Sequence, residues 1–404
     1  MIDRSQQVLL EAIKASLFNF KPTYPDDTDW DSVIKEAKAQ AVIGLISPVI
    51  PVHDESSDQG IAYYMRLLHE QDKLLKLLEA NNISCVILKG CTAAMYYPKP
   101  YLRSMGDVDF LVRQDQFDDA IGLMESNGYV CIEGKGEDGR LKKGDRHLGY
   151  SKNGIEFELH HHFSSAGFDI DDILEKAIDK RECRKLNGYS FPVLPEVENG
   201  LVLLGHINQH LKRDNLGLRQ IIDWEMYCYS VMRKEESKIE FISIAKEIGL
   251  LKLAVNVTRM CEKYLGLSES LISTGAIRKN KRNDSAEEEI VDKLLENLLT
   301  YGNFGIKQVS SSEKSGDSIR SVIGNIKHQG FYTCFQEYGM DTWKLSKKYP
   351  VLKPFAFIYG VFRIVVRGIV SIIKTGEFKE QIRYVKDNNK YDRELGIRTK
   401  DNKQ

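Results

Sequence analysis

Two aspartates, Asp107 and Asp109, stand two positions apart at the start of an apolar stretch that ends at Val112. Residues two apart in a strand point to the same face of a sheet, so a strand over 107–112 brings both carboxylates together. Such a pair can hold two divalent cations about 3.5–4 Å apart, which clamp the attacking and leaving oxygens in phosphoryl and nucleotidyl transfer. Oxygen ligands of this kind suit Mg²⁺. Because an isolated Asp-x-Asp is more often an exposed strand edge, the surrounding residues must decide between the two interpretations.

A second acidic strand is expected over 155–161. Alternation places Glu156, Glu158 and His160 on one face and apolar side chains on the other. Glu158 is therefore a candidate third carboxylate and metal ligand. The run of three histidines that begins at His160 lacks the spacing of a zinc site, because alternation turns the middle ring away from its neighbours. We interpret this run as a strand end, in which His160 could support the carboxylates.

A strand over 83–88 and a helix over about 92–97 are joined by a turn that contains Lys89 and Gly90. Glycine there allows a phosphate to approach the backbone, and the amides at the start of the helix point toward it. Lys89 and Arg103 could add cations beside a triphosphate. For Lys89 taken alone, a solvated surface charge is the better explanation, and for Arg103 the two explanations are equally good.

The order of these motifs resembles that of the uncharacterised bacterial nucleotidyltransferases of the polymerase-β-like superfamily. Their pattern is LKG, then R, then GDxDxLV, then D/E-L-H, and it is matched at residues 88–90, at Arg103, at 106–112 and at 158–160. The resemblance covers roughly residues 60–230. It implies transfer of a nucleoside monophosphate from an NTP to an acceptor hydroxyl or phosphate, with Mg²⁺ or Mn²⁺ as the metal.

In this interpretation Asp107 and Asp109 bind both metal ions. Glu158 binds the ion that activates the acceptor oxygen and takes the proton of that oxygen. Arg103 offsets charge on the leaving group, so we expect Arg103→Lys to slow transfer without affecting folding. The residues expected to contact the phosphates are Lys89, Gly90, Cys91, Thr92 and Arg103.

Two departures from the wider superfamily leave an alternative open. Gly90-Cys91 stands where Gly-Ser is usual, so a hydroxyl is missing unless Thr92 supplies it, and Glu158 replaces the commoner aspartate. The alternative is a catalytically inactive nucleotide-binding or protein-interaction module that retains the fold. Retention of three carboxylates favours the enzyme.

The resemblance extends more loosely to His210, Arg219 and Asp223, which look like a downstream His, Arg and Asp element of the family. These residues could line the substrate site. They could equally be ordinary polar groups of a helix pair, with Arg219 and Asp223 forming an ion pair one helical turn apart.

The pattern as a whole predicts an α+β protein with a nucleotidyltransferase-like mixed β-sheet core, flanking helices, and helical segments at both ends. Apolar residues recur at helical spacing before and after a middle region of strand-length runs. Within that region we also expect a helix over 115–127 and a strand over 147–151. Four segments result: 1–80, helical; 81–195, the catalytic core; 196–300, helical; and 301–404, helical with a charged flexible tail.

Composition narrows the choice of partners. Lys and Arg total 57 against 58 Asp and Glu, a formal net charge of -1, so nucleic acid is not expected as a general partner. Seven cysteines without a C-x-x-C pair argue against a disulfide framework and a structural zinc site. With no export signal at the start of the sequence, we expect a cytoplasmic protein whose partners are an NTP and an unknown small-molecule, sugar or protein acceptor.

The most apolar segment, 351–373, carries Arg363 and Arg367 near its middle. Each arginine costs about 2.5–3.5 kcal/mol at the centre of a membrane-spanning helix, so a transmembrane span is not expected. A weaker alternative is peripheral membrane contact through this segment, in an enzyme of envelope or polysaccharide assembly.

Overall fold

The computed structural model of the 404-residue chain divides into two compact units. The first comprises Met1–Lys307 together with Leu395–Gln404, and the second is Gln308–Glu394. The structure describes residues 2–136, 141, 145–164, 168–211, 216–268, 284–303, 306–307, 331–343, 345–346, 349–375 and 390–398.

The chain begins with helices, as the apolar spacing predicts. They are α1 (Arg4–Phe18), α2 (Trp30–Ala39), α3 (Ile43–Ile46) and α4 (Glu55–Ala80). Asp3 caps α1 by accepting from the Gln6 amide, while the Gln6 side chain accepts from the Asp3 amide. The last helix stops before Asn82, which has a positive φ of 59°. This turn sends the chain into the first strand of the sheet.

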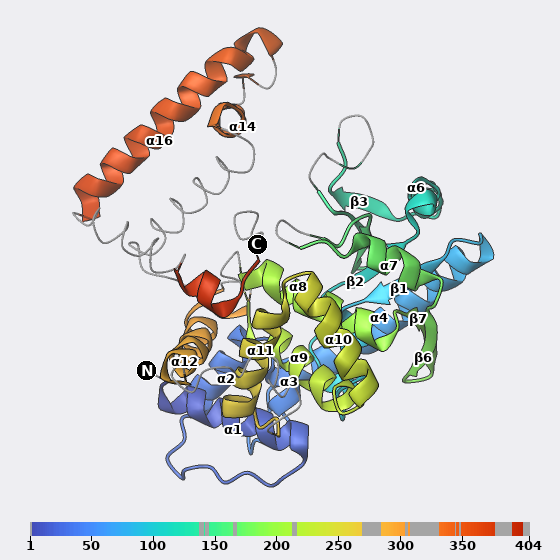
Figure 1. Ribbon diagram of the computed structural model, residues 1–404, viewed down its shortest axis with the longest axis vertical. Helices are drawn as coiled ribbons and strands as arrows, with labels where there is room; N and C mark the ends of the chain where they lie inside the picture. Colours follow the sequence, from blue (N-terminus) through green and yellow to red (C-terminus); the bar gives the residue numbers. More distant parts are fainter. Residues whose placement is uncertain are drawn as a thin grey trace. The chain divides into compact units, whose positions relative to one another are not determined.

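Within the described part of the chain, seven strands form one mixed sheet in the order β3-β4-β5-β2-β1-β7-β6 (Figure 1). They are β1 (Cys85–Leu88), β2 (Val108–Val112), β3 (Val130–Glu133), β4 (His147–Lys152), β5 (Ile155–His160), β6 (Glu182–Leu186) and β7 (Tyr189–Val193). The central pairs β2·β5 and β1·β7 are parallel, and the other pairs are antiparallel. The predicted α+β class with a mixed sheet is confirmed, whereas β3, β6 and β7 were not expected.

Further helices of this unit are α5 (Gly90–Ala94), α6 (Phe117–Ser126), α7 (Asp171–Ile178), α8 (Glu196–Leu211), α9 (Leu218–Val231), α10 (Glu235–Glu247), α11 (Leu251–Met260) and α12 (Asp284–Tyr301). The N-terminal helices join these later ones. Gln40, at the end of α2, donates to the Leu298 carbonyl of α12 and accepts from the Leu218 amide of α9. The helical parts before and after the sheet therefore form one helical body, visible beside the sheet in Figure 1.

Because side chains alternate along a strand, one face of the sheet is apolar and the other carries the carboxylates of the candidate site. Val108, Phe110 and Phe157 are buried in a cluster that includes residues of α4 and α6. Asp109 lies between Val108 and Phe110, and Glu158 directly follows Phe157, so both acids point to the opposite face. Burial of one face fixes the register of the strands, and the register fixes which polar side chains meet on the other.

The described part of the predicted flexible tail, residues 390–398, contains packed side chains, and the rest of that tail lies outside the described residues. Tyr391, Leu395 and Ile397 are buried, and the Leu395 carbonyl accepts from Asn256 of α11. Apolar side chains in a charged stretch were enough to pack residues 390–398. The structure divides the chain into two compact units, and the finer division into four segments remains a prediction.

The second unit contains α14 (Phe331–Thr342) and α16 (Lys353–Thr375). Among the helices that the structure describes, none combines the length and apolar character needed to cross a membrane.

Candidate active site

Strand pairing brings the three predicted carboxylates together. Asp109 of β2 lies opposite Glu158 of β5 in the parallel ladder, and Asp107 immediately precedes β2. Oxygen atoms of the three side chains all lie within 4.8 Å of one another. The set has the oxygen donors and the close spacing that a divalent cation site requires.

A cation of the protein already contacts these carboxylates. Lys89 Nζ lies 2.5 Å from Asp109 Oδ1 and 3.7 Å from Glu158 Oε2. Burial opposes the charged ammonium, but attraction from Asp109, Glu158 and Asp107 outweighs it and raises the pKa of Lys89. The Lys89 ammonium lies where a bound cation would contact Asp109 and Glu158, so these carboxylates accommodate a positively charged group.

The backbone at Lys89 is unusual. Its φ of 48° and ψ of -116° lie where side chains with a Cβ are rarely found, between β1 and the start of α5. This conformation turns the chain sharply, and the Lys89 side chain lies against the carboxylates of β2 and β5. Sequence reasoning favoured a surface charge for this residue taken alone, whereas its side chain is only 12% exposed.

The surroundings shift the pKa values of Asp107 and Glu158 in opposite directions. Burial, followed by repulsion from Asp109, raises the pKa of Asp107. Burial also acts to raise the pKa of Glu158, but the hydrogen bond from His160 and the attraction of Lys89 outweigh it and lower that pKa. Adjacent groups with pKa values driven apart are a mark of functional sites.

The turn after Lys89 offers backbone rather than side-chain donors. The Thr92 hydroxyl donates to the Lys89 carbonyl at 2.7 Å, and Cys91 is buried, which raises the pKa of its thiol to about 12. A Cβ on Gly90 would lie 3.5 Å from the Asp107 carbonyl oxygen. The turn thus packs against the segment that carries the aspartates.

Arg103 has a different contact from the predicted one. Its Nε and Nη2 donate to the two carboxylate oxygens of Asp223, both at 2.7 Å, and the Tyr97 hydroxyl donates to Asp223 at 2.7 Å. Arg103 is only 6% exposed. Because the guanidinium fork is engaged by Asp223, Arg103 joins the loop before β2 to helix α9 instead of facing a phosphate.

Arg219, one turn before Asp223 on α9, acts electrostatically on Asp107. Its Nη1 donates to the Ser104 carbonyl at 3.1 Å, and its charge acts to lower the pKa of Asp107. Burial and the neighbouring Arg103 lower the pKa of Arg219 itself. Unlike Arg103, it is partly exposed.

Two histidines complete the carboxylate face. His160 Nε2 lies 2.8 Å from Asp109 Oδ1 and 3.3 Å from Glu158 Oε2, and His147 Nε2 lies 3.5 Å from Glu158 Oε1. Burial and Lys89 oppose charge on His160, yet hydrogen bonds to the two carboxylates raise its pKa. His161 instead packs against the Phe117 ring, which agrees with the expected alternation.

His147 was missed by sequence reasoning, although a signal for it exists. Asn153-Gly154 is a two-residue turn with positive φ at both positions, and such a turn fixes the register of a hairpin. Counting back from it along β4 and β5 places His147 opposite His160 and Gly149 opposite Glu158.

His210 and its neighbour His206 lie on α8, with their Nε2 atoms 2.6 Å apart. Burial, then His210 and Lys89, keep the pKa of His206 well below its usual value. Gln209 of the same helix donates to the Phe163 carbonyl, and the Phe163 ring centroid lies 5.9 Å from Lys89 Nζ, so α8 of the helical body lies beside the carboxylate face.

A mixed sheet that presents an aspartate pair, a third carboxylate and a turn before a helix defines a nucleotidyltransferase-type core. The chain belongs to the family described as uncharacterised nucleotidyltransferase, whose model matches residues 26–266, more than half of the chain. Membership supports transfer of a nucleoside monophosphate group in general.

Two solved structures are similar to part of the chain. One is the solution structure of the antibiotic-resistance factor ANT(2'')-Ia, with 10% identity, a TM-score of 0.31, and coverage of 45% of this chain and 93% of that chain. The other is the crystal structure of an antigenic nucleotidyltransferase-like protein from Paracoccidioides brasiliensis, with 15% identity, a TM-score of 0.29, and coverage of 47% and 92%. No curated protein sequence matches the chain.

Proposed function

We propose that the protein transfers a nucleoside monophosphate from an NTP to an acceptor hydroxyl or phosphate, with Mg²⁺ or Mn²⁺ bound by Asp107, Asp109 and Glu158. The observation that carries the proposal is the convergence of these carboxylates around the Lys89 ammonium. When bound, divalent cations would polarise the phosphoryl oxygens and offset charge on the leaving pyrophosphate. Three carboxylates and one ammonium leave a net negative charge, which bound divalent cations would neutralise.

The protein's own groups then have separate tasks. Glu158 faces the acceptor side and receives the proton of the acceptor oxygen. His160 holds the carboxylates of Asp109 and Glu158 in place through its Nε2. With the triphosphate and its cations bound, Lys89 would exchange Asp109 for a phosphate oxygen as its partner.

We assign the phosphate-binding arginine to Arg219 and make Arg103 a positioning residue. Arg219 is partly exposed and near Asp107, whereas the fork of Arg103 is bound to Asp223. A guanidinium beside the aspartates can bind two phosphate oxygens at once. The backbone amides of Gly90 and Cys91 are the remaining donors for the outer phosphates.

Calorimetric titration with each Mg²⁺-NTP tests the metal and nucleotide assignment. We expect Asp109→Asn to weaken binding more than about a hundredfold, since even groups that only support metal ligands are worth about 10–100-fold. Glu156→Gln is the matched control, because this exposed acid lies two residues from Glu158 on the same strand. Equal affinity of Asp109→Asn and the parent would remove the metal assignment.

Transfer is tested separately, by incubating the protein with labelled NTPs, Mg²⁺ or Mn²⁺, and cell extract. The proposed reaction gives a labelled product that is absent with Asp107→Asn. Tight Mg²⁺-NTP binding without any labelled product in the extracts tried would favour the inactive nucleotide-binding module.

A further inference from the structure

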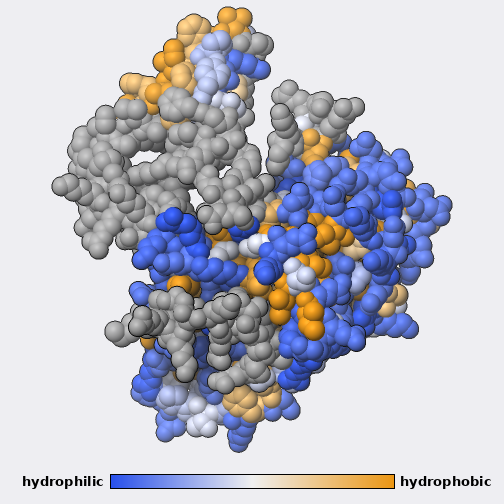
Figure 2. Space-filling model, in the orientation of Figure 1, coloured by the Kyte–Doolittle hydropathy of each residue, from blue (hydrophilic) through white to orange (hydrophobic). Residues whose placement is uncertain are grey.

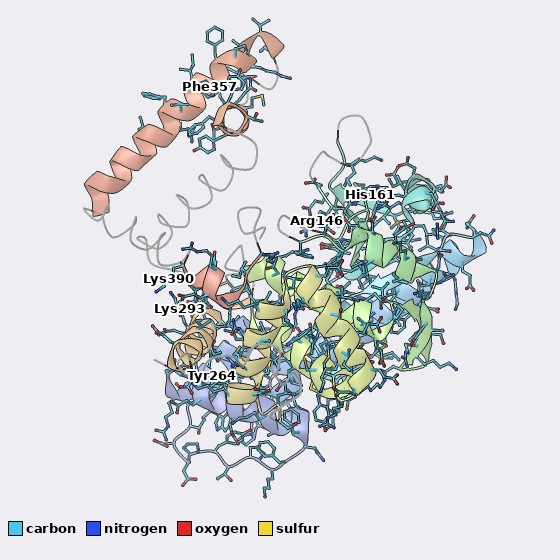
Figure 3. The ribbon with its side chains drawn as sticks, in the orientation of Figure 1. Arg146, His161, Tyr264, Lys293, Phe357 and Lys390 are labelled. Atoms are coloured by element: carbon cyan, nitrogen blue, oxygen red, sulfur yellow. The ribbon has the colours of Figure 1, made fainter. Side chains whose placement is uncertain are left out.

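Helix α16 has one side that packs inside its own unit. Gly360 is buried against α14, where a Cβ would overlap the Phe335 carbonyl oxygen. The Phe357 ring stacks on Tyr332 of α14 with centroids 4.8 Å apart, and Figure 3 labels Phe357 beside that helix. Among the residues of this unit that the structure describes, those of α14 pack on one side of α16 only.

That other side is apolar and exposed. Its members are Phe355, Ile358, Phe362 and Val366, which are 56, 62, 65 and 39% exposed. Spacings of three and four residues align them in one stripe, about three turns long, and Figure 2 shows hydrophobic side chains gathered over the described part of α16. In the sequence the same spacing continues to Ile369 and Ile373. We call the four exposed side chains the apolar stripe.

The sequence segment that contains the apolar stripe carries charges of a single sign. From residue 343 to residue 376 the sequence contains no aspartate or glutamate. It contains seven cations, namely Lys344, Lys347, Lys348, Lys353, Arg363, Arg367 and Lys374. The chain as a whole is nearly neutral, with a net charge of -1, so this segment concentrates positive charge that the rest of the sequence balances.

We propose that α16 binds along the surface of an anionic lipid bilayer, with the apolar stripe inserted at the boundary between headgroups and acyl chains. A helix with an apolar stripe and only basic charges suits that surface, because both sets of groups gain favourable contacts. Arg363 is placed for this role, since its Nη1 hydrogen bonds the Tyr359 hydroxyl beside the stripe. The binding is peripheral, because no described helix is suited to span a membrane.

Other occupants fit less well. A second copy of α16 would bring four cations against four across the interface, which repel each other at moderate salt. Nucleic acid would be bound through its phosphates and would leave the exposed apolar side chains in water. The proposal is independent of the proposed transferase activity, because Asp107, Asp109 and Glu158 belong to the first unit and α16 belongs to the second.

Flotation of the full chain with vesicles tests the proposal. We expect the protein to float with vesicles of equimolar phosphatidylcholine and phosphatidylglycerol, to float poorly with phosphatidylcholine alone, and to detach as salt increases. Phe362→Gln should reduce partitioning roughly tenfold, because it removes one large apolar side chain from the membrane contact. Lys353→Glu should reduce it on anionic vesicles only.

Ile239→Gln is the matched control, because Ile239 lies on α10 and is 61% exposed, close to the 65% of Phe362. Parental flotation of Phe362→Gln, or no flotation of the parent on anionic vesicles, overturns the proposal. A lipid-free dimer that Phe362→Gln dissociates points to a second copy instead, and salt-dependent RNA binding insensitive to that change points to nucleic acid. Nucleotide titration of the same variants should match the parent, so that failure here is distinct from failure of the transferase proposal.

Discussion

Two cation–carboxylate contacts of similar length lie close together in this protein and differ in what surrounds them. Lys89 meets Asp109 at 2.5 Å through a single point charge and is shared with other carboxylates. Arg103 meets Asp223 at 2.7 Å through two parallel hydrogen bonds, and both side chains are about 5% exposed. The first contact leaves negative charge for a ligand to neutralise, whereas the second neutralises itself and joins two parts of the fold.

The largest effect should come from breaking the second contact. Asp223→Ala leaves the Arg103 charge buried without its partner, and loss of one member of a buried pair costs about 3–5 kcal/mol. The free energy of unfolding, from urea titration, measures this cost. Asp179→Ala is the control, because Asp179 also bonds an arginine, Arg113, at 2.7 Å but is 64% exposed, so its loss should cost under about 1 kcal/mol. Similar costs for the two variants would contradict the comparison.

Replacing each arginine by lysine distinguishes the arginine that stabilises the fold from the arginine that binds nucleotide. Arg103→Lys keeps the charge but loses the paired hydrogen bonds to Asp223, so unfolding should become easier by about 1.5–3 kcal/mol. This expectation replaces the sequence-based one, in which folding was unaffected. Arg219→Lys should change stability less and weaken Mg²⁺-NTP binding roughly tenfold. The reverse pattern, with nucleotide affinity sensitive only to Arg103, would restore the original assignment.

Glu225 of α9 provides a reference carboxyl without a cation. It is fully buried and has no ion pair in the part of the chain that the structure describes. Burial raises its pKa well above 4.5, and the hydrogen bond from the Leu267 amide only partly offsets this shift. A raised folded pKa means that the folded state holds the proton, so stability falls as pH rises from 4.5 through the folded pKa. The slope contributed by this group reaches roughly 1.4 kcal/mol per pH unit.

Glu225→Gln should remove that slope and exceed the parent in stability at alkaline pH, as measured by denaturation at several pH values. The site carboxylate Glu158 should behave oppositely. Its folded pKa is lowered, so its contribution is present above 4.5 and is lost as pH falls through the folded value. An unchanged pH profile in Glu225→Gln would show that this carboxyl is solvated.

The smallest effect concerns the backbone at Lys89. Lys89→Ala and Lys89→Gly both remove the ammonium, but only glycine adopts a positive φ without strain, so the glycine variant should be more stable than the alanine variant by about 1 kcal/mol. Both variants should bind Mn²⁺ more tightly than the parent when nucleotide is absent, because the competing cation is gone. Weaker Mn²⁺ binding would mean that Lys89 supports the carboxylates instead of competing with metal ions.

The sequence by itself determined the carboxylate face. Period-two alternation fixes which side of a strand a residue occupies, and the apolar residues between Asp107, Asp109 and Glu158 left one side for the acids. The residues of two tight turns carry further information about strand register. Asn187-Gly188 marks the hairpin of β6 and β7 in the same way that Asn153-Gly154 marks that of β4 and β5, since both turns have positive φ.

Only the tertiary structure decided the partners of the cations. Arg103 and Asp223 are 120 residues apart, and no local period or propensity relates them. An arginine and an aspartate at helical spacing, Arg219 and Asp223, suggested a local pair, yet the folded chain brings Arg103 to that aspartate. The guanidinium group of Arg103 pairs with the carboxylate that lies next to it in the folded chain. Long-range packing therefore determined which arginine joins the fold and which lies beside the aspartates.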